Sequence, residues 1–128
     1  MSSEAEAAPV VVEYRGGIAV FSFPSRAFQK KEAEYFSFLL DQLQKQGIHD
    51  YIVDLTECDY VSSEGLGATA RCWKWCHDQK NGSMAVVLSS SSGNEVRNLF
   101  EIIGLSHMIG SAIQPTLDDA IIYVKNFS

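Results

Sequence analysis

The stretch YIVDLTECDYVSSEGLG, residues Tyr51–Gly67, decides the fold of this chain. It begins with the mostly apolar run Tyr51–Leu55, which is typical of a short strand buried on both faces. After a polar loop, a helix is predicted to begin at Ser63 or Glu64 and to end at Gln79. A buried strand, a loop and a helix in this order indicate one unit of an α/β fold.

The same alternation extends in both directions along the chain. Two β-rich runs at residues 10–14 and 18–23 flank Arg15-Gly16-Gly17, which predicts a hairpin. Apolar residues at spacings of three and four predict further helices. Nine elements are predicted in the order β-β-α-β-α-β-α-β-α, at about residues 10–14, 18–23, 29–46, 51–55, 63–79, 84–88, 96–103, 108–113 and 115–124.

This order predicts an α/β fold with a mixed, mostly parallel sheet, an N-terminal β-hairpin as its antiparallel edge, and about four helices. In such sheets, functional groups gather in loops beyond the carboxyl ends of the strands. The loop Thr56–Ser63 is therefore the first place to look for a site.

Composition narrows the class of protein. The 128 residues suit one domain, predicted at 9–128 after a short disordered lead-in at 1–8. A net charge of −6 argues against nucleic acid as a partner. The sequence contains no apolar run that could span a bilayer, and its acidic N-terminus lacks the features of a signal peptide. With three cysteines, a cytoplasmic protein with reduced thiols is predicted.

Ser63 is the candidate functional residue of the predicted site. A serine at this point is typical of an N-cap, which contributes about 1 kcal/mol, and Ser62 could equally be the cap. Gly65 and Gly67 lie in the first turns of the helix, where each costs about 1 kcal/mol against alanine. That cost indicates that some group approaches the backbone closely there.

Metal and cofactor sites are not predicted. Cys72, Cys76 and His77 could share one face of a helix, but a structural zinc needs four ligands, so buried thiols are the favoured interpretation. The glycines are not followed by Lys-Ser or Lys-Thr, so a phosphate-binding loop is excluded. Trp73 and Trp75 are predicted to point to different faces, one into the core and one toward a partner.

Hydrolytic chemistry at Ser63 is also disfavoured. It would need a histidine base and an orienting acid, and none of His49, His77 and His107 is predicted beside the serine. The nearby carboxylates are predicted to form a solvated acidic rim; they are Asp54, Glu57, Asp59 and Glu64.

The strand Tyr51–Leu55 and the following Cys58–Gly67 together resemble the signature of the STAS domain, most closely that of bacterial anti-sigma factor antagonists. The stretch Glu95–Leu105 is similar to the third-helix motif of the same family. The resemblance runs from about Val10 to Val124.

The resemblance implies a non-enzymatic, phosphorylation-switched binding protein. The unmodified antagonist binds an anti-sigma factor that is also a serine kinase with a histidine-kinase-like ATPase fold. The kinase phosphorylates one serine of the antagonist and releases it, and a PP2C-type phosphatase restores the serine. Neither a nucleic acid nor a membrane is a predicted partner.

The family pattern Asp-Ser-Ser-Gly-Leu-Gly places the phosphorylated serine at Ser63, with Ser62 as the alternative. Ser62 stands where the family has aspartate, and Glu64 stands where it has a second serine. After the second predicted strand, Phe23–Arg26 replaces a stretch that is often acidic and lies near the partner surface. The partner-binding residues implied are Ser62, Ser63, Glu64, Gly65, Gly67 and Ser25.

Two other functions stay open. A STAS scaffold or adaptor in a stress-signalling or transport complex would use Ser63 only as a cap. A small-molecule binder or enzyme would use the loop Thr56–Ser63, which lacks a base beside the serine.

Overall fold

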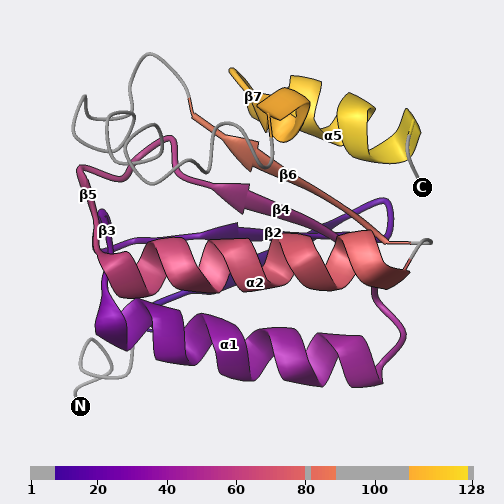
Figure 1. Cartoon of the computed structure of the whole chain (residues 1–128). Helices are drawn as coiled ribbons and strands as arrows, with labels where there is room; N and C mark the ends of the chain where they lie inside the picture. Colours follow the sequence, from indigo (N-terminus) through magenta and orange to yellow (C-terminus); the bar gives the residue numbers. More distant parts are fainter. Residues whose placement is uncertain (1–7, 80–81, 89–109, 127–128) are drawn as a thin grey trace.

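The computed structural model describes residues 8–79, 82–88 and 110–126. Within them one five-stranded sheet has the order β1-β2-β4-β6-β7 (Figure 1). Neighbouring strands are antiparallel in the β1–β2 pair and parallel in the others. The mixed, mostly parallel sheet is therefore confirmed. Its strands are β1 (Val11–Arg15), β2 (Ile18–Ser22), β4 (Asp50–Asp54), β6 (Ser83–Val87) and β7 (Ile113–Gln114).

The N-terminal hairpin turns at Gly16 and Gly17. Arg15 pairs with Ile18, so the loop has two residues. Both glycines have positive φ, 59° and 85°. A type I′ turn, one of the two favoured in two-residue hairpin loops, needs positive φ at both positions, which glycine adopts without a steric penalty.

Helices cover both faces of the sheet (Figure 1). The helices α1 (Lys30–Lys45) and α2 (Ser63–Gln79) lie on one face, and α5 (Leu117–Asn126) lies on the other. Successive strand residues point to opposite faces. Val53 of β4 accordingly packs in the cluster under α1 and α2, and Ile52 packs in the cluster under α5.

Helix α1 has defined ends. The buried Glu32 accepts a hydrogen bond from the backbone N–H of Gln29 at 3.0 Å, which satisfies a donor at the helix start. Gly47 has a φ of 86° just after the helix and ends it, as predicted. Of the predicted apolar face, Ala33, Phe36, Leu40 and Leu43 are buried and Leu39 is half-buried.

A second, two-stranded sheet was not predicted. In it β3 (Ala27–Phe28) pairs in parallel with β5 (Tyr60–Val61). Each strand has two residues, too few for a periodic pattern. The pairing joins the loop after β2 to the loop before α2, so this small sheet fixes where α2 begins.

The C-terminal part departs from the prediction of a strand at 108–113. Residues 108 and 109 lie outside the described residues, Gly110–Ala112 is a 3-10 turn, and the described strand is Ile113–Gln114, paired with Val86 and Val87. Pro115 follows, and it has no N–H with which to extend the ladder. The helix predicted at 96–103 lies outside the described residues, as does most of the predicted lead-in at 1–8.

In the part of the chain that the structure describes, no helix is long and apolar enough to cross a membrane.

Candidate functional site

Ser62 is the N-cap of α2. Its Oγ accepts the backbone N–H of Gly65 at 3.3 Å, the usual bond of an N-cap. Its own N–H donates to the carbonyl of Phe28 at 3.0 Å, which continues the β3–β5 pairing. Of the two serines that could cap the helix, the structure thus selects Ser62, and the interpretation of Ser63 as the cap is wrong.

Ser63 is the first residue of α2, and its side chain is exposed. Beside it, the pKa of the exposed Glu64 carboxyl is lowered, mainly by a backbone N–H at the helix start, then by the hydroxyl of Ser62, and further by Lys30 and the hydroxyl of Ser63. The start of α2 therefore favours negative charge at these two positions, as expected from unpaired N–H groups and the helix dipole.

The two serines are expected to respond differently to truncation. Ser62→Ala removes the cap and should lower the free energy of unfolding by about 1 kcal/mol. Ser63→Ala leaves the cap in place and should change it by less than about 0.5 kcal/mol. Urea unfolding of both variants measures this difference, and equal losses would contradict the assignment of the cap to Ser62.

Gly65 lies where the helix meets the small sheet. A Cβ at this position would lie 2.3 Å from the carbonyl oxygen of Phe28 and 2.9 Å from its ring. The close approach that the sequence indicated is therefore real at Gly65, and the approaching group is the backbone of β3.

Gly67 has no such contact. A Cβ there would lie 3.6 Å from Nη1 of Arg71, which is ordinary van der Waals contact. Packing among the residues that the structure describes does not require this glycine. It borders instead an open groove of about 400 Å³ between α1 and α2.

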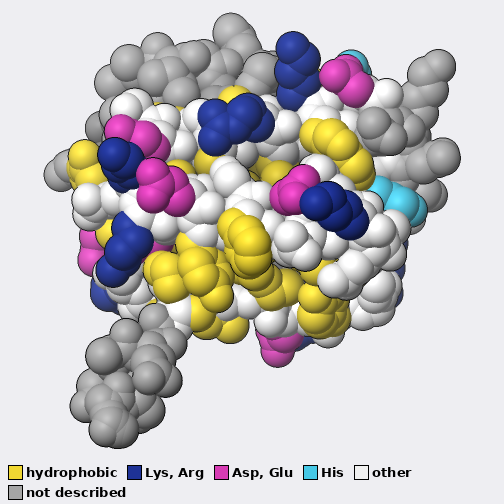
Figure 2. Space-filling model, turned by 90° about the horizontal axis from the view of Figure 1, so that it is seen from below, with side chains coloured by type: hydrophobic (Ala, Val, Ile, Leu, Met, Phe, Trp, Pro, Cys, Tyr) yellow, Lys and Arg dark blue, Asp and Glu magenta, His cyan; other side chains and the backbone are white. Residues whose placement is uncertain are grey.

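The groove contains Ser63. From α1 it is lined by Lys30, Glu34 and Ser37 among others, and from α2 by Ser63, Gly67 and Arg71. Figure 2 shows this face of the molecule, with basic and acidic side chains close together toward one end. Phe38 of α1 is 59% exposed, and its ring centroid lies 6.5 Å from that of Tyr35. Exposed aromatic rings and arginine are enriched in protein-binding surfaces, so Phe38 of α1 and Arg71 of α2 favour such a role for these two helices.

Ser25 has a structural contact at the start of α1. Its Oγ donates to Oε2 of the buried Glu32 at 3.1 Å, while Oε1 of that carboxylate caps the helix. Ser25 does not line the groove that contains Ser63. Its role as a partner contact stays a prediction.

Arg26 forms ion pairs with two carboxylates of the predicted acidic rim. Arg26, with a φ of 65°, donates from Nε to Asp59 at 2.8 Å and from Nη1 to Glu57 at 3.0 Å. The hydrogen bond from Arg26 lowers the pKa of Asp59. Glu57, Asp59 and Glu64 are exposed, as predicted, whereas Asp54 is half-buried and accepts hydrogen bonds from the backbone N–H and the hydroxyl of Thr56. The pairing of Glu57 and Asp59 with Arg26 was not predicted.

The three cysteines are buried free thiols, as predicted. Burial, followed by the charge of Asp54, raises the pKa of Cys58 to about 12, so this thiol is not a nucleophile at neutral pH. Across residues 8–79, 82–88 and 110–126, no three His, Cys, Asp or Glu side chains are grouped to hold a metal ion.

The histidines of the described chain lie far from Ser63 along their elements. His77 is in the last turn of α2, and His49 precedes β4. His107 lies outside the described residues. Neither His49 nor His77 lines the groove that contains Ser63.

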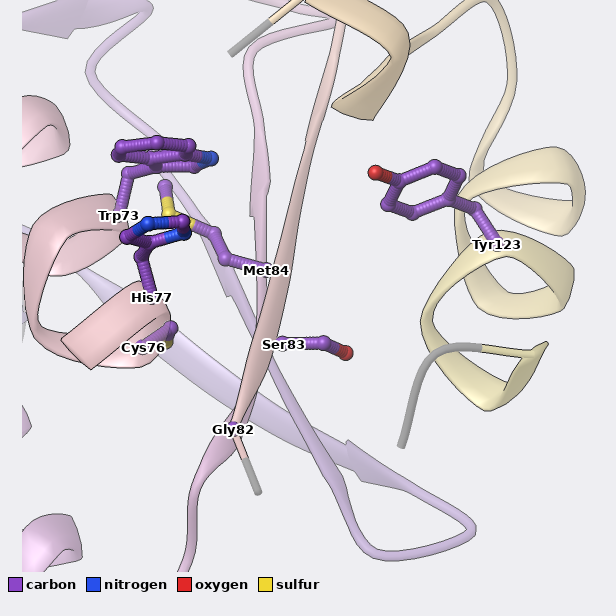
Figure 3. A pocket seen from close by; sticks show the side chains of 7 residues that line it. All are labelled: Trp73, Cys76, His77, Gly82, Ser83, Met84 and Tyr123. Atoms are coloured by element: carbon purple, nitrogen blue, oxygen red, sulfur yellow. The ribbon is translucent and has the colours of Figure 1, made fainter. Parts of the chain in front are cut away.

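The prediction for the tryptophans is wrong in one respect, because both are half-buried. Helix α2 packs against α1 on one side and against the sheet on another, so much of its circumference is covered. Trp75 meets the ring of Tyr51 edge-on at 6.1 Å. Trp73 stacks on His77 with ring centroids 4.9 Å apart and lines a second hollow, shown in Figure 3, near the end of α2 remote from Ser63.

Comparison with known proteins identifies the family. The model of the STAS domain matches residues 9–120. The chain belongs to the STAS domain family. Comparison of the sequence with curated proteins returns no match.

Three solved structures illustrate the likeness of fold. An anti-sigma factor antagonist from Mycobacterium paratuberculosis has a TM-score of 0.70 at 21% identity, covering 91% of this chain and 92% of that one. The anti-sigma factor antagonist SpoIIAA in its unphosphorylated form has a TM-score of 0.63 at 13% identity, covering 88% and 94%. The murine anion transporter Slc26a9 has a TM-score of 0.62 at 17% identity, covering 89% of this STAS chain and 18% of the transporter.

Proposed function

We propose that this STAS domain is an anti-sigma factor antagonist that binds an anti-sigma factor with serine kinase activity and is released when Ser63 is phosphorylated. The position of Ser63 carries the proposal. It is exposed in the first turn of α2 and borders the α1–α2 groove, and Ser62 does the capping. A group added to Ser63 is therefore presented to a partner without disturbing the helix start.

The domain performs no chemistry of its own in this proposal. The kinase, of histidine-kinase-like ATPase fold, transfers the γ-phosphoryl group of ATP to Oγ of Ser63, which loses its proton, and ADP leaves. A PP2C-type phosphatase hydrolyses the ester and restores the serine. Binding and release exchange the partners of the sigma factor and so regulate transcription in the cytoplasm.

The partner surface is centred on the start of α2. Ser62 and Gly65 shape it, because both contact Phe28. Ser63, Glu64 and Gly67 line the groove and can be touched directly. Ser25 belongs to this surface only if the partner extends to the start of α1.

The test is phosphorylation by the cognate kinase, sought among the products of neighbouring genes. After incubation with ATP, mass spectrometry should find one added phosphate on the peptide containing Ser63. The Ser63→Ala variant should remain unmodified, whereas Ser62→Ala should be modified normally. Phosphate that persists in Ser63→Ala and disappears in Ser62→Ala would move the site to Ser62.

A second candidate is a STAS scaffold that does not switch, in a stress-signalling or transport complex. Two observations favour it: the structural likeness to the STAS region of an anion transporter, and Glu64 where the family pattern has a serine. The two functions differ in one measurement, because a scaffold binds its partner equally well after Ser63→Asp.

A further inference from the structure

Three residues of α2 form a stripe along the groove. Ser63, Gly67 and Arg71 are spaced by four, so they lie one above the other on one face of the helix. Long side chains in a helix point back toward its N-terminus. Nη1 of Arg71 accordingly lies 3.6 Å from the place that a Cβ of Gly67 would take. The guanidinium group therefore lies over Gly67, one turn from Ser63.

A second cation faces the same serine from the other helix. Lys30 is the first residue of α1, and it lines the groove together with Ser63 and Arg71. Its charge is one of the causes that lower the pKa of Glu64, after the backbone N–H and the hydroxyl of Ser62. The ammonium group is therefore close enough to act on a negative charge at the start of α2.

Both cations are available to a new anion. Among residues 8–79, 82–88 and 110–126, no carboxylate lies within 4.0 Å of Lys30 or Arg71, in contrast to Arg26, which binds Glu57 and Asp59. Two further acidic side chains, Glu34 and Glu64, also line the groove. The two positive and two negative side chains of the groove balance before modification, so a phosphate would compete with Glu34 and Glu64 for Lys30 and Arg71.

We propose that Lys30 and Arg71 are the counter-charges of a phosphate on Ser63 and hold it in the groove between α1 and α2. The phosphate then occupies the α1–α2 groove of the same chain. Gly67 contributes by having no side chain between Arg71 and Ser63. The inference rests on the proposed modification of Ser63, and it adds the two residues that receive the phosphate.

The experiment uses the full chain with phosphoserine incorporated at position 63 during translation, so it needs neither the kinase nor the anti-sigma factor. Phosphorus NMR then follows the second ionisation of the phosphate between pH 4 and pH 9. An exposed phosphoserine has a pKa of about 6 for this step. Nearby cations favour the dianion and lower this pKa.

We expect Lys30→Gln and Arg71→Gln each to raise the pKa of the phosphate, and the double variant to raise it by about one pH unit. Lys45→Gln is the matched control, because Lys45 lies in the last turn of α1 and pairs with Asp41. It should leave the pKa of the phosphate unchanged. An equal pKa in the parent and the double variant would overturn the inference.

Thermal unfolding is a second measurement. At pH 8 the phosphoserine chain should unfold at a higher temperature than the unmodified chain, and this gain should be smaller in the double variant, which keeps only the contribution of the helix start. A gain of equal size in the double variant would assign the stabilisation to the helix start alone and overturn the role of the two cations. Because the phosphate is installed directly, neither result depends on whether a kinase modifies Ser63.

Discussion

Phosphorylation of Ser63 is expected to weaken binding of the anti-sigma factor about a thousandfold. The phosphate adds about −1.5 to −2 charge at pH 7 at an exposed position beside Glu64. A unit negative charge of the anti-sigma factor placed 4 Å from the phosphate would be repelled by about 4 kcal/mol per unit charge at an effective dielectric constant near 20. That energy corresponds to about three powers of ten in the dissociation constant.

The fold itself should tolerate the modification. A negative charge at a helix N-terminus is stabilising by about 0.3–1 kcal/mol. The surroundings of Glu64 already lower its pKa, so the same environment accepts charge one residue earlier. The loss of affinity is therefore expected to come from the interface and not from unfolding.

Titration calorimetry with the anti-sigma factor that binds the unmodified chain measures this effect. The comparison is between the unmodified chain, the phosphoserine chain and Asn126→Asp. Asn126 is exposed at the end of α5, on the opposite face of the sheet, so this variant adds negative charge away from the proposed surface. Asn126→Asp should bind within about twofold of the parent. Affinity of the phosphoserine chain within threefold of the parent would contradict the switch and favour the scaffold.

The large elements of the fold could be predicted because each carries a periodic pattern. Helix α1 has five apolar residues on one face and a glycine stop, and β4 and β6 each contain an apolar run, Tyr51–Val53 and Met84–Val87. The small sheet could not be predicted this way. Ala27–Phe28 and Tyr60–Val61 come together only after the chain has folded, and two-residue strands have no period.

The sequence indicated the start of α2 as the candidate site, but it did not indicate which of the two serines caps the helix. Ser62 and Ser63 are identical in chemistry, and either could cap the helix. The choice is made by the β3–β5 pairing, since the N–H of Ser62 donates to Phe28 and thereby fixes the residue at which the helix begins. The pairing of Arg26 with Glu57 and Asp59 likewise spans more than thirty residues of sequence.

The two glycines of the motif show what can be concluded from the low helix propensity of glycine. A glycine in a helix indicates that something else requires it, but the sequence does not distinguish two glycines that lie two residues apart. The structure separates them. Gly65 is required by the backbone of β3, whereas Gly67 borders an open groove.

Gly65→Ala is expected to lower the free energy of unfolding by about 3 kcal/mol. The added Cβ would lie 2.3 Å from the carbonyl oxygen of Phe28 and 3.0 Å from Cγ1 of Val61. A backbone oxygen cannot rotate away, so β3 must move from α2, and overpacking of this kind costs about 1–3 kcal/mol or more. Since the N–H of Ser62 donates to the same oxygen, that hydrogen bond is weakened as well.

Gly67→Ala is the matched control, because it makes the same chemical change one half-turn later in the same helix. Among the described residues, apart from its chain neighbours and the nearby backbone of the helix, the nearest heavy atom to its added Cβ is Nη1 of Arg71 at 3.6 Å. Alanine should then gain about 1 kcal/mol in helix propensity and raise the free energy of unfolding. Urea unfolding of the two variants should therefore give changes of opposite sign. If both stabilise the chain, α2 does not pack against the carbonyl of Phe28, and the small sheet does not fix the start of the helix that presents Ser63.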